Sequence, residues 1–247
     1  MPARCGRRSG ASGDGPKGPC STRIVNSAGC GVGRWGGDGS RGAARRRSGS
    51  ACTAPISSFN AERIVALERR LGIHVEPALQ RLLLPRRRLV AVLNVAYVTL
   101  NVGLTVGWLM RLFRRSDPEF HRLRSAAALA TLGAQPVFLL YPTAPPRTLD
   151  HFVDTIAEVS RIDLDRGLIA QLYDPLAALP SIHVAYAVVT ATGVAGTSGS
   201  ALARAVAPAY PPLVALVVMA TANHYVLDVL AGAALAGAAL RAARRLA

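Results

Sequence analysis

The stretch LVAVLNVAYVTLNVGLTVGWLMRLF, residues 89–113, decides the fold class of this chain. A helix that crosses a bilayer needs about 20 mostly apolar residues, and this stretch reaches that length with Trp108 close to one end. The sequence therefore predicts a transmembrane helix from Leu89 to Phe113.

Four further apolar stretches follow towards the C-terminus. They are Leu123–Tyr141, Leu179–Gly196, Val206–Ala222 and Tyr225–Leu240. The last two lie so close together that a tight turn near Asn223 must join them. The expected fold is therefore all-α: a polytopic transmembrane helical bundle with five visible spans.

Upstream of these spans, the chain has the spacing of amphipathic helices. Apolar residues such as Ile64 alternate with charged residues such as Glu68. Gly72 is expected to end a first helix, and Pro77 suits the first turn of a second. Neither helix is long or apolar enough to span, so residues 56–88 are predicted to be interfacial helices on the membrane surface.

Residues 1–55 are rich in Gly, Arg and Ser and cannot bury enough apolar surface to offset the entropy of ordering. They are predicted to be a disordered tail, which is either a functional basic segment or the product of a wrongly assigned start codon. The tail shows no clear signal peptide. The remainder, residues 89–247, is the predicted catalytic bundle. The cysteines of the tail lack CxxC spacing and a nearby histidine, so they predict no zinc site; they are Cys5, Cys20, Cys30 and Cys52.

The formal net charge of +15 is unevenly spread along the chain. Ten of the Lys and Arg residues lie in residues 1–55, where Trp35 is the only aromatic side chain. Aromatic stacking on bases is therefore scarce, and no nucleic-acid partner is expected. Most of the remaining arginines stand at the ends of apolar runs, which is typical of membrane topology.

Arginine clusters orient the predicted spans. By the positive-inside rule they belong in the cytoplasm, and the net acidic loop Thr143–Ala178 then lies outside. We expect an integral protein of the plasma membrane whose histidine motifs face the extracytoplasmic side. Residues 86–88 are all arginine and conflict with this topology, so either they lie in the outer headgroup layer or a span upstream of them is missing. The orienting clusters are Arg111, Arg114, Arg115, Arg122 and Arg124, and Arg241, Arg244 and Arg245.

His224 and Asp228 give the strongest local signal of chemistry. Residues four apart on a helix share a face, so the Asp228 carboxylate can accept a hydrogen bond from one ring nitrogen of His224. That bond fixes the tautomer and leaves the other nitrogen free to attack an electrophile. A purely structural His–Asp pair would have the same spacing, but ionisable groups at the mouth of an apolar bundle are costly and usually functional.

Ser181, His183 and Arg147 supply the other expected contacts with a phosphate. A helix start at Ser181 favours an anion through its free N–H groups, and His183 can protonate a leaving oxygen as a general acid. The guanidinium of Arg147, held after two prolines, suits phosphate. The plainer alternatives are a helix cap at Ser181, a hydrated interfacial His183 and an ordinary loop arginine.

Taken together, these residues predict an enzyme that works without a metal or cofactor. The expected catalytic residues are His224, His183 and Asp228, with Arg147 and Ser181 binding phosphate. A serine hydrolase is not expected, because Ser181 lacks the surroundings of a nucleophile elbow. A catalytic zinc is not expected either, because the chain has no HExxH motif and no second pair of ligands.

The motifs PPR (145–147), PSIHVAYA (180–187) and TANHYVLDVLAG (221–232) resemble the type-2 phosphatidic acid phosphatase superfamily. They are most similar to the branch that includes inositol phosphorylceramide synthases and aureobasidin-resistance proteins. Two positions depart from the broader superfamily, which has arginine where this chain has Val218 and glycine where it has Ile182. Both departures are typical of the synthase-like branch.

The resemblance implies a bundle of about six transmembrane helices with its site at the extracytoplasmic face. It implies that His224 becomes phosphorylated, that Asp228 orients it and that His183 protonates the leaving group. Ser181 and Arg147 would hold phosphate oxygens, and no metal would take part.

The function implied by the resemblance is that of a membrane phosphotransferase, which moves a phosphoryl-containing group of a lipid-like substrate through a phosphohistidine. The substrate would be a membrane lipid or lipid phosphate, and the acceptor a polyol such as inositol. One alternative is a lipid phosphate or pyrophosphate phosphatase with water as acceptor, and another is a non-enzymatic membrane protein on the same fold. Asp150, His151 and Asp154 are candidates for polyol contacts, although acidic loops are more often simply solvated.

Overall fold

The computed structural model describes residues 53–161 and 176–246, which belong to one compact unit. Over these residues the chain is helical and forms no strand, apart from an isolated parallel bridge between Thr143 and Ala177. The predicted all-α fold is confirmed. The predicted tail lies almost wholly outside the described residues, since the first helix begins at Thr53.

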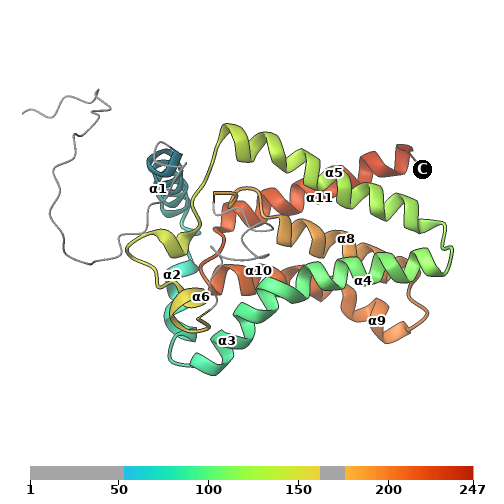
Figure 1. Cartoon of the computed structure of the whole chain (residues 1–247), viewed down its shortest axis with the longest axis horizontal. Helices are drawn as coiled ribbons and strands as arrows, with labels where there is room; N and C mark the ends of the chain where they lie inside the picture. Colours follow the sequence, from blue (N-terminus) through green and yellow to red (C-terminus); the bar gives the residue numbers. More distant parts are fainter. Residues whose placement is uncertain (1–52, 162–175, 247) are drawn as a thin grey trace, which may run out of the picture. The chain divides into compact units, whose positions relative to one another are not determined.

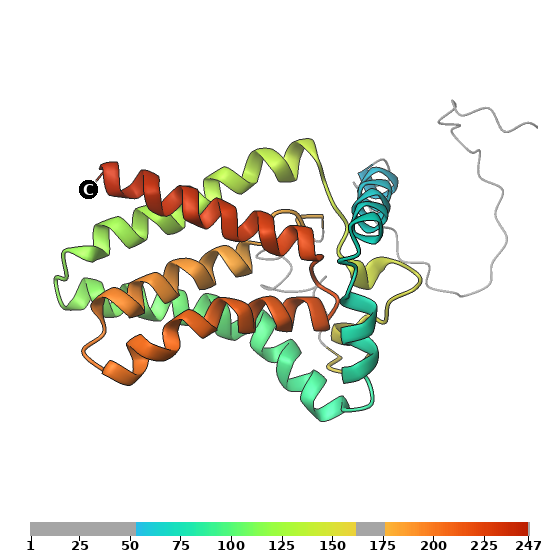
Figure 2. The ribbon, with the colours of Figure 1, turned by 180° about the vertical axis from the view of Figure 1, so that it is seen from behind.

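A central helix, α8 (Ile182–Thr197), organises the bundle. It packs against α4, α5, α10 and α11, so four helices surround it (Figures 1 and 2). Its contacts with α5 and α11 are lined by fully buried alanines, including Ala126, Ala185 and Ala236. Small side chains allow helix axes to approach closely. In a bilayer, where the hydrophobic effect does not drive helices together, this close packing is what holds them. The surrounding helices are α4 (Asn101–Arg114), α5 (Glu119–Leu140), α10 (Tyr210–Ala220) and α11 (Val226–Leu246).

The number of spans differs from the predicted five. Within the described residues, three helical segments are long and apolar enough to cross a membrane: Glu119–Leu140, Ala201–Ala220 and Val226–Leu246. The helices Arg87–Thr99 and Asn101–Arg114, bent by 44°, add a fourth if the pair forms one span. The predicted span Leu179–Gly196 is only the 16-residue α8, because its helix begins three residues later than predicted, after the cap at Ser181.

The bend in the first span coincides with a π-helical turn. Helix α3 (Arg87–Val95) passes into the π-helix Ala96–Leu100 before α4 begins. Such turns carry one residue more per turn and often occur at functional sites. In this chain the π-helical turn carries Tyr97, which is buried in the interior.

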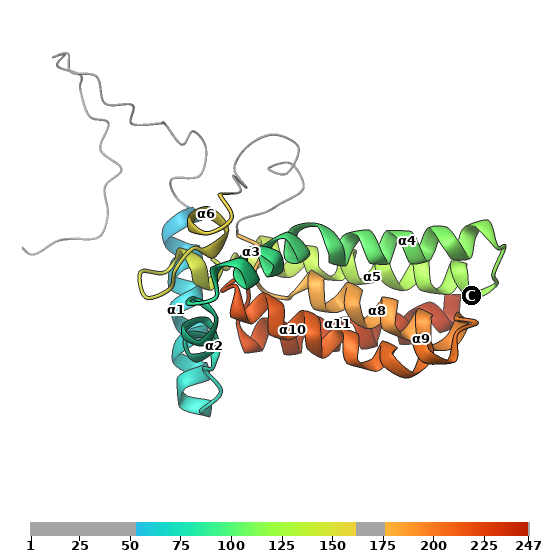
Figure 3. The same cartoon turned by 90° about the horizontal axis from the view of Figure 1, so that it is seen from below.

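Helices α1 (Thr53–Leu71) and α2 (Glu76–Leu83) lie across one end of the bundle (Figure 3). The buried face of α1 packs on loop residues and on Tyr225, at the head of α11. Gly72, with φ of +70°, ends α1 as expected, and Pro77 lies in the first turn of α2. The location of this pair on a membrane surface stays a prediction.

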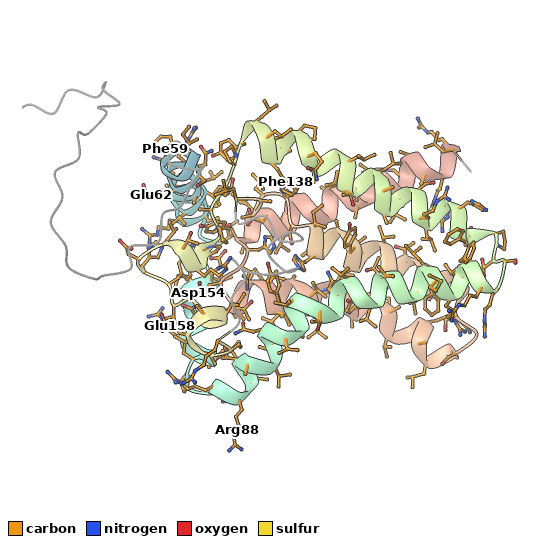
Figure 4. The ribbon with its side chains drawn as sticks, viewed as in Figure 1. Phe59, Glu62, Arg88, Phe138, Asp154 and Glu158 are labelled. Atoms are coloured by element: carbon orange, nitrogen blue, oxygen red, sulfur yellow. The ribbon has the colours of Figure 1, made fainter. Side chains whose placement is uncertain are left out.

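The two ends of the bundle differ in their charged groups. Asp154 caps the short helix α6 (Thr155–Glu158) and Glu158 ends it, at the end where α1 lies (Figure 4), which also carries the arginines of α1 and α2. The last turns of α4 and α11 carry arginines at the other end, where the C-terminus lies (Figure 1). Arg88, from the cluster that conflicts with the topology, is exposed and points away from the bundle (Figure 4).

Gly232 lies where the backbone of α11 comes close to the backbone of Ser181, at the start of α8. A Cβ atom at this position would lie 2.2 Å from the backbone oxygen of Ser181, a distance that real Cβ atoms do not adopt. Only glycine therefore lets α11 contact the start of α8 as it does.

We expect Gly232→Ala to destabilise the protein, because backbone on both sides would have to move apart. Overpacking of this kind costs about 1–3 kcal/mol, which corresponds to a fall of roughly 5 °C in the thermal unfolding midpoint. The matched control is Gly237→Ala on the same helix, where a Cβ would meet only the tip of Arg241, at 3.8 Å. Equal unfolding midpoints for the two variants in detergent would contradict the argument.

Candidate active site

His224 lies in the turn between α10 and α11, and Asp228 lies in the first turn of α11. The two residues are therefore not on one helix, as the spacing had predicted, but their side chains still meet. The Nδ1 atom of His224 lies 3.4 Å from Oδ2 of Asp228 and 2.9 Å from the carbonyl oxygen of Ala178. The same Oδ2 accepts a hydrogen bond from the backbone N–H of Tyr225, at 2.9 Å. Asp228 thus holds both the imidazole and the backbone that follows it.

These contacts assign the tautomer of His224. A carbonyl oxygen can only accept, so Nδ1 carries the proton and Nε2 has the lone pair. Burial lowers the pKa of the imidazole to about 4; the bond with the Ala178 carbonyl opposes this shift, and the positive charge of Arg147 adds to it. The ring is therefore neutral at physiological pH, and Nε2 is available as a nucleophile.

His183 lies in the first turn of α8, beside His224. The centroids of the two imidazole rings are 5.7 Å apart. On its other side, the His183 ring stacks on Tyr97 at 4.4 Å between centroids, with 27° between the planes. The structure therefore brings together the two histidines that were predicted to share one site, although they lie 41 positions apart in the sequence.

Ser181 joins the starts of α8 and α11. Its backbone N–H donates to the carbonyl of Asp228 at 3.0 Å, and its buried hydroxyl accepts from the backbone N–H of Val184 at 3.3 Å. The hydroxyl thus caps α8, as the plainer alternative had it. A hydroxyl that accepts one bond still has a proton to donate, so capping and phosphate binding are compatible.

Arg147 is held against the turn that carries His224. Its backbone N–H donates to the carbonyl of Ala222 at 2.8 Å, and its Nε donates to Oδ1 of Asn223 at 3.0 Å. One terminal nitrogen, NH1, lies 3.2 Å from the Asp154 carboxylate. The side chain is only 8% exposed. Asp154 thus pairs with Arg147, whereas the other two candidates for polyol contacts, Asp150 and His151, are exposed.

Three residues around His183 were missed by the sequence analysis: Asn101, Tyr210 and Tyr97. Asn101 donates from Nδ2 to the carbonyl oxygen of His183 at 2.8 Å, and Tyr210 donates from its hydroxyl to Oδ1 of Asn101 at 2.8 Å. An amide inside an apolar span is a signal that could have found Asn101, because polar groups there are costly. Tyr97 carried no such signal, since its place beside His183 depends on the π-helical turn.

The family model of the PAP2 superfamily matches residues 62–242. No curated protein and no solved structure matches the chain. The match begins in α1 and ends in α11, so it includes part of α1, the whole of α2, the bundle and every candidate site residue. This integral membrane protein therefore belongs to the PAP2 superfamily, whose members are phosphatases and phosphotransferases.

Proposed function

We propose that this chain is a membrane phosphotransferase that moves a phosphoryl-containing group of a lipid-like substrate through a phosphohistidine at His224. The observation that carries the proposal is the bonding of the imidazole: Nδ1 is held by the Ala178 carbonyl and Asp228, so that Nε2 has the free lone pair. Membership of the PAP2 superfamily supports the same class of chemistry.

The first half-reaction forms a bond between Nε2 of His224 and phosphorus. The bond from phosphorus to the leaving oxygen breaks, and His183, which enters this step as an imidazolium beside the anionic phosphate, gives one proton to that oxygen and becomes neutral. The attacking ring gains positive charge, which the Asp228 carboxylate at 3.4 Å stabilises. The 5.7 Å between ring centroids is a span that a phosphoryl group and its leaving oxygen can bridge.

The second half-reaction returns the group to an oxygen. His183, now neutral, takes the proton of an acceptor hydroxyl, whose oxygen attacks phosphorus while the phosphorus–nitrogen bond breaks. A polyol such as inositol as acceptor gives the transferase of the synthase-like branch. Water as acceptor gives a lipid phosphatase or pyrophosphatase, and both outcomes use the same catalytic residues.

Arg147 and Ser181 are the proposed phosphate ligands. The backbone, Nε and NH1 of Arg147 are all engaged, which orients the guanidinium before any substrate arrives. Preorganised donors stabilise the charge of a phosphoryl transition state without reorganisation. Ser181 would add its hydroxyl proton at the start of α8, where the helix dipole also favours an anion.

The proposed site faces the extracytoplasmic side of the plasma membrane. His224 and Arg147 belong to the end of the bundle where α1 and α2 lie, which carries arginines and acids together, whereas the last turns of α4 and α11 at the other end carry arginines and no acid. Under the positive-inside rule the arginine-rich end is cytoplasmic. A lipid substrate would then present its headgroup to the site from the outer leaflet.

The phosphohistidine is tested by His224→Gln, which keeps a hydrogen-bonding side chain but removes the nucleophile. With phosphorus-labelled lipid phosphates, we expect the rate to fall by roughly four orders of magnitude and the alkali-stable label on the protein to disappear. Added inositol or glycerol distinguishes the acceptors, since label on the alcohol means transfer and free phosphate means hydrolysis. His121→Gln, at an exposed histidine on α5, is the control. Turnover that survives in His224→Gln would contradict a phosphohistidine at His224. Absence of turnover in the wild type on every substrate would favour the non-enzymatic alternative.

Asp228→Asn tests the orienting role. An amide oxygen can still accept from the N–H of Tyr225, so the unfolding midpoint should stay close to that of the wild type. The neutral side chain no longer stabilises a charged imidazole, so kcat should fall by about 10²–10⁴. An unchanged kcat would remove Asp228 from the mechanism.

Arg147→Lys tests phosphate binding while it keeps the positive charge. Loss of the forked donor should lower kcat/KM by about 10–100-fold, which corresponds to about 1.5–3 kcal/mol for hydrogen bonds to a charged group. The control is Arg88→Lys, at an exposed arginine, which should leave kcat/KM unchanged. If both variants behave like the wild type, Arg147 does not contact the phosphate.

A further inference from the structure

A cluster of ionisable side chains lies outside the proposed site, where α1 and α2 meet. It consists of Glu68 on α1, His74 in the connecting turn and Glu76 at the start of α2. The Nδ1 atom of His74 lies 3.1 Å from Oε2 of Glu76 and 3.4 Å from Oε2 of Glu68. One nitrogen and one oxygen from each carboxylate thus lie within 4.8 Å of one another.

The cluster is buried. Glu68 and Glu76 are 0% exposed and the side chain of His74 is 10% exposed. The sequence had assigned Glu68 to the polar face of an amphipathic helix, and the structure corrects this. Two carboxylates removed from water need a counter-charge close by, because an uncompensated buried charge costs several kcal/mol.

The two oxygens of each carboxylate have different roles. Oε1 of Glu68 accepts from the backbone N–H of Leu227 at 2.8 Å, and Oε1 of Glu76 accepts from that of Val226 at 2.7 Å. The remaining oxygens turn towards the imidazole. Among the described residues, Oε2 of Glu76 is fully buried and receives no hydrogen bond of good geometry, although Nδ1 of His74 lies 3.1 Å away. A buried acceptor without a partner requires an explanation, and here it points at the centre of the cluster.

We propose that Glu68, His74 and Glu76 bind one zinc ion. Zinc bonds of about 2.0–2.2 Å in tetrahedral geometry place neighbouring ligand atoms roughly 3.4 Å apart. The two nitrogen–oxygen distances, 3.1 and 3.4 Å, match that spacing. The ion would take Oε2 of Glu76 as a ligand, which gives the unpartnered oxygen its partner. Water would complete the fourth position.

The donor set selects the metal. Imidazole together with carboxylate suits zinc, whereas calcium and magnesium prefer six or more oxygen ligands. Two ionised carboxylates balance the charge of a divalent ion. Their Oε1 atoms accept backbone N–H groups, which are the kind of outer contacts that orient metal-binding carboxylates.

The ion would have a structural role. It would fix α1 and α2 to each other and, through the hydrogen bonds of the carboxylates, to the first turn of α11. It would take no part in phosphoryl transfer, and the inference does not rest on the proposed function.

The first experiment uses the wild-type protein, purified in detergent without chelators. Mass spectrometry should find about one zinc per chain. Chelation should lower the thermal unfolding midpoint, and added Zn²⁺ at a hundredfold excess over its dissociation constant should restore about 5 °C or more. No zinc after equilibration with Zn²⁺, or a midpoint that neither chelation nor Zn²⁺ shifts, would overturn the proposal and leave a proton shared between the carboxyls as the explanation.

The second experiment identifies the ligands. Glu76→Gln keeps an oxygen that can accept from Val226, and His74→Gln keeps a polar side chain, so both variants should fold. Each should lose zinc to background and lose the response to added Zn²⁺. His121→Gln, on an exposed face of α5, should keep one zinc per chain. Zinc that is equally abundant in all three variants would be adventitious and would overturn the assignment.

Discussion

The arrangement of the site depends on one hydrogen bond, from the backbone N–H of Ser181 to the carbonyl of Asp228 at 3.0 Å. It fastens the start of α8 to the start of α11, and so brings the histidine of each segment beside the other. The bond can form because Gly232 has no side chain to separate the two backbones. Backbone geometry therefore sets the distance between the catalytic candidates before any of their side chains is considered.

Negative charge at the start of α11 reinforces this arrangement. Three successive backbone N–H groups, of Tyr225, Val226 and Leu227, each donate to a carboxylate. A helix start leaves its first N–H groups without partners inside the helix, and its dipole favours acidic groups there. Asp228 supplies one of these carboxylates from within the helix. The other two come from α1 and α2, so these two helices help to hold the turn that carries His224.

Much of the fold could be predicted from the position and length of the apolar stretches, because a stretch long enough to span a bilayer folds as a helix. The predicted span Leu123–Tyr141 agrees closely with α5, Glu119–Leu140. The predicted Tyr225–Leu240 ends too early, because its terminal arginines continue α11 to Leu246. The π-helical turn Ala96–Leu100 could not be predicted, since its residues are ordinary apolar ones and the turn arises from tertiary packing. The spacing of His224 and Asp228 identified the pair, but not the Ala178 carbonyl that fixes the ring.

The carboxylates of α1 and α2 are separated from their partners on α11 by 159 and 150 residues of chain, respectively. Contacts between such distant parts of the chain form late in folding, because the entropy of closing the loop is lost before the contacts can stabilise the fold. During synthesis, α1 and α2 emerge long before α11 exists. The turn that carries His224 therefore reaches its final geometry only after α11 has been synthesised. Under the proposed function, a nascent chain that already carries Arg147 and His183 would have no activity until α11 has folded against α1 and α2.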